Sequence, residues 1–244
     1  MAALLFVPGI ASAQDKSLSP EQRSAFEGVI RDYLLKNPAI IRDAMDALQA
    51  QEEAAKQAAA VAALKDHQDD LFRNPSSPVG GNPKGDVTIV EFFDYNCGYC
   101  KRVAPAVKAV LNGDPNIRIV YKEFAILGPQ SLAAAKAALA AHRQGKYREL
   151  HEALMASSQA DEESALAFAK QLGLDVARLR KDMKDPAIAQ IIERNYQIAT
   201  ALGINGTPAF IIGNRLVPGA IDADAMAEIV REQRALNKAG PKIQ

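Results

Sequence analysis

The chain has 244 residues, and 48% of them are hydrophobic, which is enough to build a substantial core. Lys plus Arg and Asp plus Glu each number 29, so there is no basic excess to indicate nucleic-acid binding. The composition predicts a globular protein and excludes the strongly basic and strongly acidic classes, and we expect no nucleic-acid partner.

The N-terminus has the pattern of an export signal. Residues 1–13 (MAALLFVPGIASA) form an apolar run ending in Ala11-Ser12-Ala13, the small-x-small pattern that signal peptidase reads. The alternative is an ordinary N-terminal tail, because the basic residues usual at the start of a signal are missing. No other segment reaches the roughly 18 apolar residues needed to span a bilayer. We therefore interpret residues 1–13 as a signal peptide remnant and expect an exported protein.

Two helices are predicted next. The segment Ser19-Pro20-Glu21-Gln22 combines an N-cap, a proline in the first turn and a capping-box glutamine, so a helix is expected through about Leu35. Asn37-Pro38 repeats the signal, and the second helix is expected to run unbroken to about Phe72.

The second helix has apolar positions spaced alternately four and three residues apart, which favours a coiled-coil seam of self-associating chains. These positions are Ile41, Met45, Leu48, Ala55, Ala59 and Ala62. The alternative is a long helix packed on its own domain. We expect residues 14–72 to be a helical oligomerisation stalk.

Residues 73–86 (RNPSSPVGGNPKGD) are rich in Pro, Gly, Ser and Asn without periodicity, which predicts a linker. The remainder, 87–244, alternates strand and helix patterns, with a largely helical insertion at about 131–202. The strands are expected at 87–93, 117–124, 209–212 and 216–217, with helices at 101–111 and 222–236. This order predicts an α/β domain containing a βαβ unit.

Cys97 and Cys100 are the two cysteines of the chain and are separated by Gly98 and Tyr99. A bridge between them would close almost no loop, so structural bracing explains them poorly. Cys97 follows a strand and begins a helix, where free N–H groups and the helix dipole favour a thiolate. We expect Cys97 to attack disulfides and Cys100, one turn further on, to resolve the mixed disulfide.

A metal site is the alternative use of the two thiols. Zinc would need four ligands, and the remaining candidates, His67, His142 and His151, have no paired spacing near the motif and are expected to be solvated helix residues. A two-thiolate Cu(I) site stays open as an alternative. We expect neither a resident metal nor a small-molecule cofactor.

The motif Glu91-Phe92-Phe93-Asp94-Tyr95-Asn96-Cys97-Gly98-Tyr99-Cys100, followed by Gly206-Thr207-Pro208-Ala209-Phe210, resembles the DsbA-like family of thioredoxin-fold proteins. The resemblance covers about residues 87–236 and implies a thioredoxin-like fold with an all-helical insertion, preceded here by the N-terminal helical segment.

The resemblance also implies roles for Thr207 and Pro208. In the family, the matching proline is cis and lies beside the cysteines, so that the backbone of the preceding residue meets an extended substrate peptide. A proline just ahead of a strand is compatible with such a turn, and an ordinary trans proline is the alternative.

Glu91 lies six residues before Cys97 in an otherwise apolar strand. Burial would raise the pKa of its carboxyl, so it could accept and return the proton of Cys100. In the family an acid at the matching position lies beneath the active site. An ion pair with Lys122 on the neighbouring strand is the alternative, with a purely structural role.

Within the family, Gly98-Tyr99, Thr207 and the helical N-terminus resemble the periplasmic disulfide isomerases, in particular the suppressor-of-copper-sensitivity C group. The resemblance implies a periplasmic homo-oligomer that reshuffles wrong disulfides in exported proteins and is served by a membrane redox partner. Two rivals remain: a monomeric dithiol oxidase, and a Cu(I)-binding or peptide-holding protein without turnover. The CxxC motif alone does not fix the redox poise that separates isomerase from oxidase.

Overall fold

The computed structural model describes residues 19–239, so the predicted signal segment 1–13 lies outside the described residues. It divides into two compact units, residues 1–55 and 56–244. The N-terminal helices are α1 (Pro20–Lys36), α2 (Ala39–Asp66) and α3 (Gln68–Phe72).

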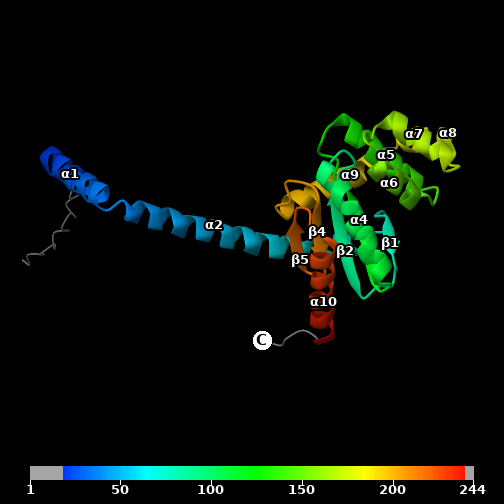
Figure 1. The fold of residues 1–244 in the computed structure, drawn as a ribbon. Helices are drawn as coiled ribbons and strands as arrows, with labels where there is room; N and C mark the ends of the chain where they lie inside the picture. The colour runs from blue at the N-terminus through cyan, green and yellow to red at the C-terminus, as the bar shows by residue number, and fades with distance from the viewer. Residues whose placement is uncertain (1–18, 240–244) are drawn as a thin grey trace, which may run out of the picture. The chain divides into compact units, whose positions relative to one another are not determined.

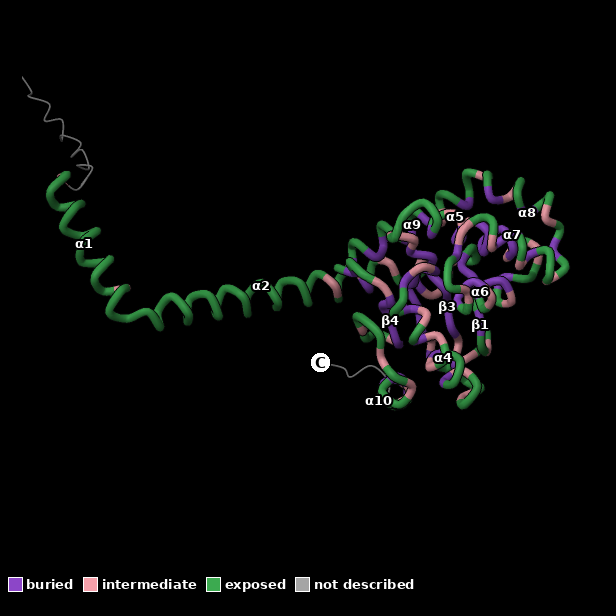
Figure 2. The backbone as a smooth tube through the Cα atoms, turned by 45° about the horizontal axis from the view of Figure 1, so that its top comes forward, coloured by how far each residue is buried: buried purple, intermediate pink, exposed green. Residues whose placement is uncertain are grey.

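Helix α1 begins as expected. The Ser19 hydroxyl accepts a hydrogen bond from the Gln22 backbone, and the Gln22 side chain reaches back to the Ser19 N–H, which completes a capping box with Pro20 in the first turn. None of the helix is buried. Figure 2 shows α1 and most of α2 as exposed.

The second predicted helix ends earlier than expected, at Asp66, and α3 then forms a separate short helix. No Gly or Pro signals this break. Leu64 and Leu71 are buried in a core cluster of the catalytic unit, residues 56–244, rather than in the stalk. The stalk boundary expected at residue 72 therefore moves to about residue 55.

A five-stranded mixed sheet forms the centre of the catalytic unit, in the order β1-β3-β2-β4-β5 (Figure 1). Strands β2 and β3 pair in parallel, and the other three pairs are antiparallel. The strands are β1 (Val79–Gly81), β2 (Val87–Phe93), β3 (Ile117–Glu123), β4 (Ala209–Ile212) and β5 (Arg215–Pro218).

The sheet is covered on both faces. Ile89 and Phe93 of β2 pack in the core cluster that includes α4 (Gly98–Gly113) and α10 (Ala223–Ala239), while Val90 and Phe92 pack in the cluster that includes α3 and the end of α9. Burial on both faces explains why β2 is continuously apolar rather than alternating. It also leaves Glu91 in a dry position, on the same face as Ile89 and Phe93.

The expected linker at 73–86 is part of the sheet. It contains β1, which pairs antiparallel with β3 at Val79 and Val120. Gly81 has a φ of +63°, and a Cβ there would lie 2.5 Å from the carbonyl oxygen of Ile117. The glycines therefore let β1 approach β3 closely. The Gly-rich and Pro-rich composition that predicts a linker belongs here to a short edge strand.

The helical insertion lies between β3 and β4, as expected. Its helices are α5 (Pro129–His142), α6 (Tyr147–Ala156), α7 (Glu162–Gln171), α8 (Val176–Asp182) and α9 (Pro186–Ala201). Helix α5 is rich in buried alanines, whose small side chains let the neighbouring helices approach closely. The thioredoxin-like fold with a helical insertion is confirmed.

Candidate active site

Cys97 and Cys100 lie where β2 leads into α4, and both are free thiols. Cys97 is the N-cap residue of α4, with extended backbone, and its Sγ accepts a hydrogen bond from the backbone N–H of Cys100 at 3.3 Å. A side chain that caps a helix N-terminus through its sulfur is held where the helix dipole stabilises negative charge.

The two cysteines differ in accessibility. Cys97 is 6% exposed, less than the sequence suggests for an attacking group, whereas Cys100 is 0% exposed. Burial raises the pKa of Cys100 well above the ordinary value of a thiol. Of the two cysteines, Cys97 is thus the one that keeps some exposed surface.

Thr207 and Pro208 lie beside this pair, as the resemblance implies. The peptide bond between them is cis. The Cys97 thiol donates a hydrogen bond to the carbonyl oxygen of Thr207 at 3.2 Å, across 110 residues of sequence. The Thr207 N–H has no hydrogen-bond partner among the described residues.

Within the motif, Gly98 opens α4, and Tyr99 is 61% exposed. The guanidinium carbon of Arg102 lies 4.1 Å from the centre of the Tyr99 ring, which is a cation-π arrangement. Lys101 instead donates to the backbone carbonyls of Ser157 and Ser158, so it ties the first turn of α4 to the segment after α6.

Glu91 is 2% exposed, and burial raises the pKa of its carboxyl to about 8. It lines a cavity of about 600 Å³ between α4, α6 and the sheet, and the lining includes neither cysteine. Lys122 is not its partner. The ammonium of Lys122 donates to the Asp70 carbonyl and the Ser77 hydroxyl, so no ion pair explains the buried Glu91.

The loop before Cys97 is held by buried and partly buried polar contacts that the sequence does not reveal. The carboxylate of Asp94 accepts hydrogen bonds from the backbone of Asn96 and Leu127 and from the Ser131 hydroxyl. The Asn96 amide pairs with both the N–H and the carbonyl of Ala160, at 2.9 and 2.8 Å. The helical insertion therefore fixes the backbone from which Cys97 is presented.

His151 was expected to be a solvated helix residue, but it is buried within hydrogen-bond distance of Tyr95. Glu123, at the end of β3, is buried with it. Unlike Glu91, Glu123 ends a strand that also carries Arg118 and Lys122, so no local pattern in the sequence identifies it. Among the described residues, no group of three or more His, Cys, Asp or Glu side chains could hold a metal ion.

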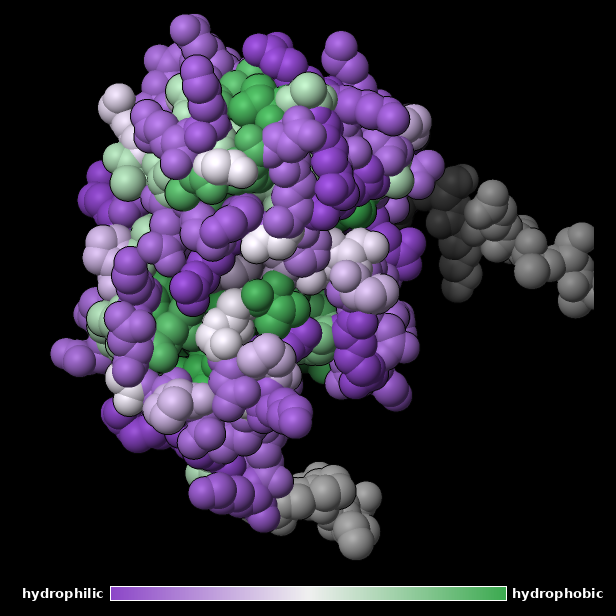
Figure 3. Space-filling model, turned by 90° about the vertical axis from the view of Figure 1, so that its right-hand side faces the viewer, coloured by the Kyte–Doolittle hydropathy of each residue, from purple (hydrophilic) through white to green (hydrophobic). Residues whose placement is uncertain are grey.

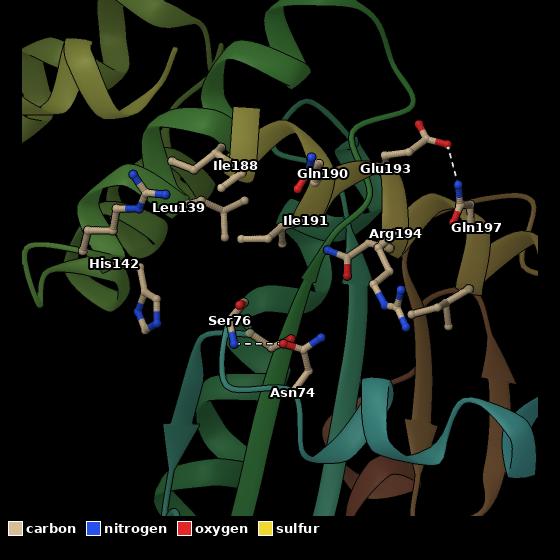
Figure 4. A pocket seen from close by; sticks show the side chains of 15 residues that line it. Asn74, Ser76, Leu139, His142, Ile188, Gln190, Ile191, Glu193, Arg194 and Gln197 are labelled. Carbon is tan, nitrogen blue, oxygen red and sulfur yellow. Dashed lines mark hydrogen bonds between the residues drawn. The ribbon is translucent and has the colours of Figure 1, made fainter. Parts of the chain in front are cut away.

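A second cavity, of about 650 Å³, lies between α5, α9 and the segment before β1 (Figure 4). Its two arginines are already paired, Arg143 with Asp185 and Arg194 with Asp70, and Glu193 accepts a hydrogen bond from Gln197. On the face shown in Figure 3, hydrophobic surface is divided into patches by hydrophilic side chains. Within residues 19–239, no helix is both long and apolar enough to cross a membrane.

Comparison with known proteins decides the family. The family described as the DSBA-like thioredoxin domain matches residues 88–231, more than half of the chain. The chain belongs to the DsbA-like thioredoxin family. Within this DsbA-like chain, residues 22–55 match a second family, described as the N-terminal domain of the copper resistance protein ScsC.

Several solved structures are similar to this DsbA-like chain, among them the following two. A thioredoxin-like oxidoreductase from Silicibacter pomeroyi DSS-3 is 46% identical, with a TM-score of 0.67, over 68% of this chain and 97% of that one. ScsC from Proteus mirabilis, in a transitional conformation, is 30% identical, with a TM-score of 0.66, over 90% of this chain and 100% of that one. The predicted family and its ScsC-like group are confirmed.

A curated relative, the Na(+)/H(+) antiporter NhaA 1 of Salinispora arenicola, is 31% identical over 167 residues. The match covers 67% of this DsbA-like chain but 26% of that protein, so this chain spans only a small part of the length of the antiporter it matches.

Proposed function

We propose that this chain is a periplasmic disulfide isomerase that acts on misfolded or reduced exported proteins through Cys97 and Cys100. The observation that carries the proposal is the position of the Cys97 sulfur, which caps α4 and lies 3.2 Å from the Thr207 carbonyl oxygen. One nucleophile is thereby held at a helix N-terminus and beside the N–H of Thr207, which is free among the described residues and could bind an extended peptide.

The exchange proceeds by successive attacks of thiolates on disulfide bonds. The Cys97 thiolate attacks one sulfur of a substrate disulfide, so a Cys97–substrate disulfide forms and the second substrate sulfur leaves as a thiolate. In isomerisation, another thiolate of the same substrate attacks the mixed disulfide, and Cys97 is released as a thiolate. If Cys100 attacks instead, Cys97 and Cys100 become oxidised and the substrate leaves with its disulfide reduced.

Glu91 is proposed to move the proton of Cys100. In its carboxylate form it accepts the proton as Cys100 attacks, and in its acid form it returns the proton when the Cys100 thiolate leaves. A pKa near 8 keeps both forms within reach at neutral pH. Glu91 also lines the cavity between α4 and α6, so a proton could reach this carboxyl from that side without passing the cysteines.

Thr207 is proposed to bind the substrate backbone. Its N–H has no partner among the described residues, and β4 begins two residues later, so an extended peptide could pair with it as a strand does. Pro208 has a fixed φ and no backbone N–H. It is proposed to hold the turn in which Thr207 lies, so that the Thr207 N–H stays available to the substrate backbone.

The N-terminal helices are proposed to assemble several chains. On α1, the exposed apolar residues recur at helical spacing, and α2 continues with three more. They are Phe26, Val29, Ile30, Tyr33, Ile41, Met45 and Leu48, all at least 49% exposed. The match of residues 22–55 to the ScsC N-terminal domain supports the same assignment. A homo-oligomer would surround a misfolded chain with several Cys97 sulfurs.

The proposed isomerase needs Cys97 reduced, so we also propose a membrane redox partner that supplies electrons, and no small-molecule cofactor. The rival is a monomeric dithiol oxidase. One observation favours it: the DsbA-like match, residues 88–231, lies wholly within the catalytic unit and does not involve the stalk.

Trapping the thiols of the protein in cells with an alkylating reagent tests the proposal. Reduced cysteines in the resting cell support the isomerase, whereas a predominantly oxidised pair supports the oxidase. Purified protein that binds Cu(I) but neither reduces insulin nor repairs scrambled ribonuclease would contradict both and leave the copper-binding alternative.

A further inference from the structure

A buried cluster of four polar side chains adjoins the active-site loop, and the proposed reaction assigns none of them a role. It consists of Tyr95, Glu123, Tyr147 and His151, and we call it the Glu123 cluster. Tyr95 lies two residues before Cys97, Glu123 ends β3, and the other two belong to α6 of the helical insertion. Each is at most 7% exposed.

The cluster is joined by hydrogen bonds to one carboxylate oxygen. Oε1 of Glu123 accepts from the Tyr95 hydroxyl at 3.0 Å and from the Tyr147 hydroxyl at 2.8 Å. The Tyr95 oxygen also lies 3.1 Å from Nδ1 of His151. Because the single Tyr95 proton goes to Glu123, Nδ1 of His151 must carry the hydrogen in this third contact.

Charge and burial agree with this arrangement. Burial raises the pKa values of Tyr95 and Tyr147 well above the ordinary value, so both hydroxyls remain donors. Burial lowers the pKa of His151 to about 3, so its ring stays neutral at physiological pH. For Glu123, burial raises the pKa to about 8, and the two tyrosine hydrogen bonds act in the opposite direction.

Tyr95 connects this cluster to the reacting sulfur. The Cys97 N–H donates to the Asp94 carbonyl at 3.1 Å, so the backbone folds back on itself around Tyr95. Asp94 and Asn96, on either side of Tyr95, are held by β3–α5 loop residues and by Ala160. The Tyr95 hydroxyl therefore adds a third anchor to this turn, through its hydrogen bond to Glu123.

We propose that Glu123 is a positioning residue for thiol–disulfide exchange, which acts on Cys97 through the Tyr95 hydroxyl and not through its charge. The inference rests on the proposed function, because it concerns the same exchange. Loss of the anchor would let the turn shift, and small displacements of a reacting atom slow a reaction steeply. The distances from Cys97 Sγ to the Cys100 N–H and the Thr207 carbonyl would change with it.

An electrostatic role is the competing explanation. Glu91 and Glu123 lie on the same face of adjacent parallel strands, two register positions apart, and the charges of Glu91 and Asp94 both raise the pKa of Glu123. If Glu123 acted by charge, its neutralisation would shift the pH dependence of Cys97 reactivity even with every hydrogen bond in place.

Two tyrosine variants form a matched pair that separates these roles. Tyr95→Phe and Tyr147→Phe each delete one buried hydroxyl that donates to the same oxygen, so both should lower the urea midpoint similarly. We expect Tyr95→Phe to slow iodoacetamide alkylation of Cys97 by at least about fivefold and to shift its equilibrium with glutathione, with Tyr147→Phe within about twofold of the parent. Equal rates in both variants would overturn the proposal.

Two substitutions of Glu123 complete the test. Glu123→Gln keeps an oxygen that accepts from both tyrosines, so Cys97 alkylation and its pH profile should stay close to those of the parent, whereas Glu123→Ala should behave like Tyr95→Phe. A pH profile displaced by Glu123→Gln would overturn positioning in favour of charge. Alkylation measures the reactivity of Cys97 directly and does not depend on isomerase activity. A parent protein that fails to repair scrambled ribonuclease would therefore refute the proposed function but not the positioning role of Glu123.

Discussion

The sulfur of Cys97 accepts a hydrogen bond from the backbone N–H of Cys100, three residues further along the same helix. One cysteine is thereby the cap of α4 while the other is buried inside its first turn. Because the helix N-terminus favours an anion at Cys97 only, the geometry divides the two sulfurs into an attacking and a resolving group.

This division predicts unequal chemistry. At pH 6, iodoacetamide should label Cys97 of the reduced protein and leave Cys100 largely unlabelled, because burial raises the pKa of Cys100. Cys97→Ser should abolish attack on disulfides, and Cys100→Ser should accumulate mixed disulfides through Cys97. Mass spectrometry of the labelled peptides measures the order, and faster labelling of Cys100 would reject it.

Glu91 should make stability depend on pH. Its pKa is about 8 in the folded protein against an ordinary 4.5, so between these values the folded state holds a proton that the unfolded state has lost. Stability contributed by this group is therefore lost as pH rises from about 4.5 to 8.

Glu91→Gln removes that loss. At pH 4.5, urea unfolding should give nearly the same free energy of unfolding for the parent and for Glu91→Gln. At pH 7, the free energy of unfolding of the variant should exceed that of the parent by up to about 3 kcal/mol. The same variant should slow disulfide formation between Cys97 and Cys100. A stability difference that does not grow with pH would mean that the Glu91 carboxylate is already ionised in the fold.

Two hydrogen bonds between Asn96 and Ala160 hold the loop before Cys97, and we call them the loop clamp. Asn96→Ala removes both hydrogen bonds to Ala160 and should lower the free energy of unfolding by about 1–3 kcal/mol. Asn82→Ala is a suitable control, because Asn82 also bonds two backbone groups, but through hydrogen bonds that are exposed to solvent. Thermal unfolding of both variants measures the difference, and equal losses would argue against the clamp.

The revised stalk boundary predicts opposite effects at two apolar residues. Leu71 is fully buried, so Leu71→Ala should destabilise the catalytic unit by about 2–5 kcal/mol. Met45 is 65% exposed, so Met45→Asp should leave that unit's unfolding unchanged but lower the mass measured by light scattering. An unchanged mass would remove Met45 from the proposed assembly surface.

The sequence predicts the catalytic core well because its signals are local. A β-branched and aromatic run, a CxxC motif at a helix start and a Thr-Pro pair ahead of a strand each lie within a few neighbouring residues. The Glu123 cluster is different: Tyr95 bonds Glu123 across 28 residues and His151 across 56. Such pairings arise from the tertiary fold, so no local pattern indicates them.

The two boundary corrections have similar causes. The Gly and Pro residues around Val79 predict a linker. A three-residue edge strand, however, needs no alternating pattern, and its glycines allow the close approach of β3. The break of the long helix at His67 has no Gly or Pro to mark it. Packing of Leu71 against the sheet decides it, which is a tertiary effect that overrides helix propensity.

These corrections change how the stalk should be removed. Deleting residues 1–72 would take Leu64 and Leu71 out of the core, whereas deleting residues 1–55 follows the boundary of the compact unit. The protein from 56 to 244 should fold, scatter light as a monomer and still form the disulfide between Cys97 and Cys100.

Repair of scrambled ribonuclease by the full-length protein, compared with the protein from 56 to 244, tests the central claim most directly. If several Cys97 sulfurs around one assembly are what makes an isomerase, the full-length protein should restore ribonuclease activity and the shorter one should not, although both reduce insulin. Full repair by the shorter protein, or none by the full-length protein, would contradict the account.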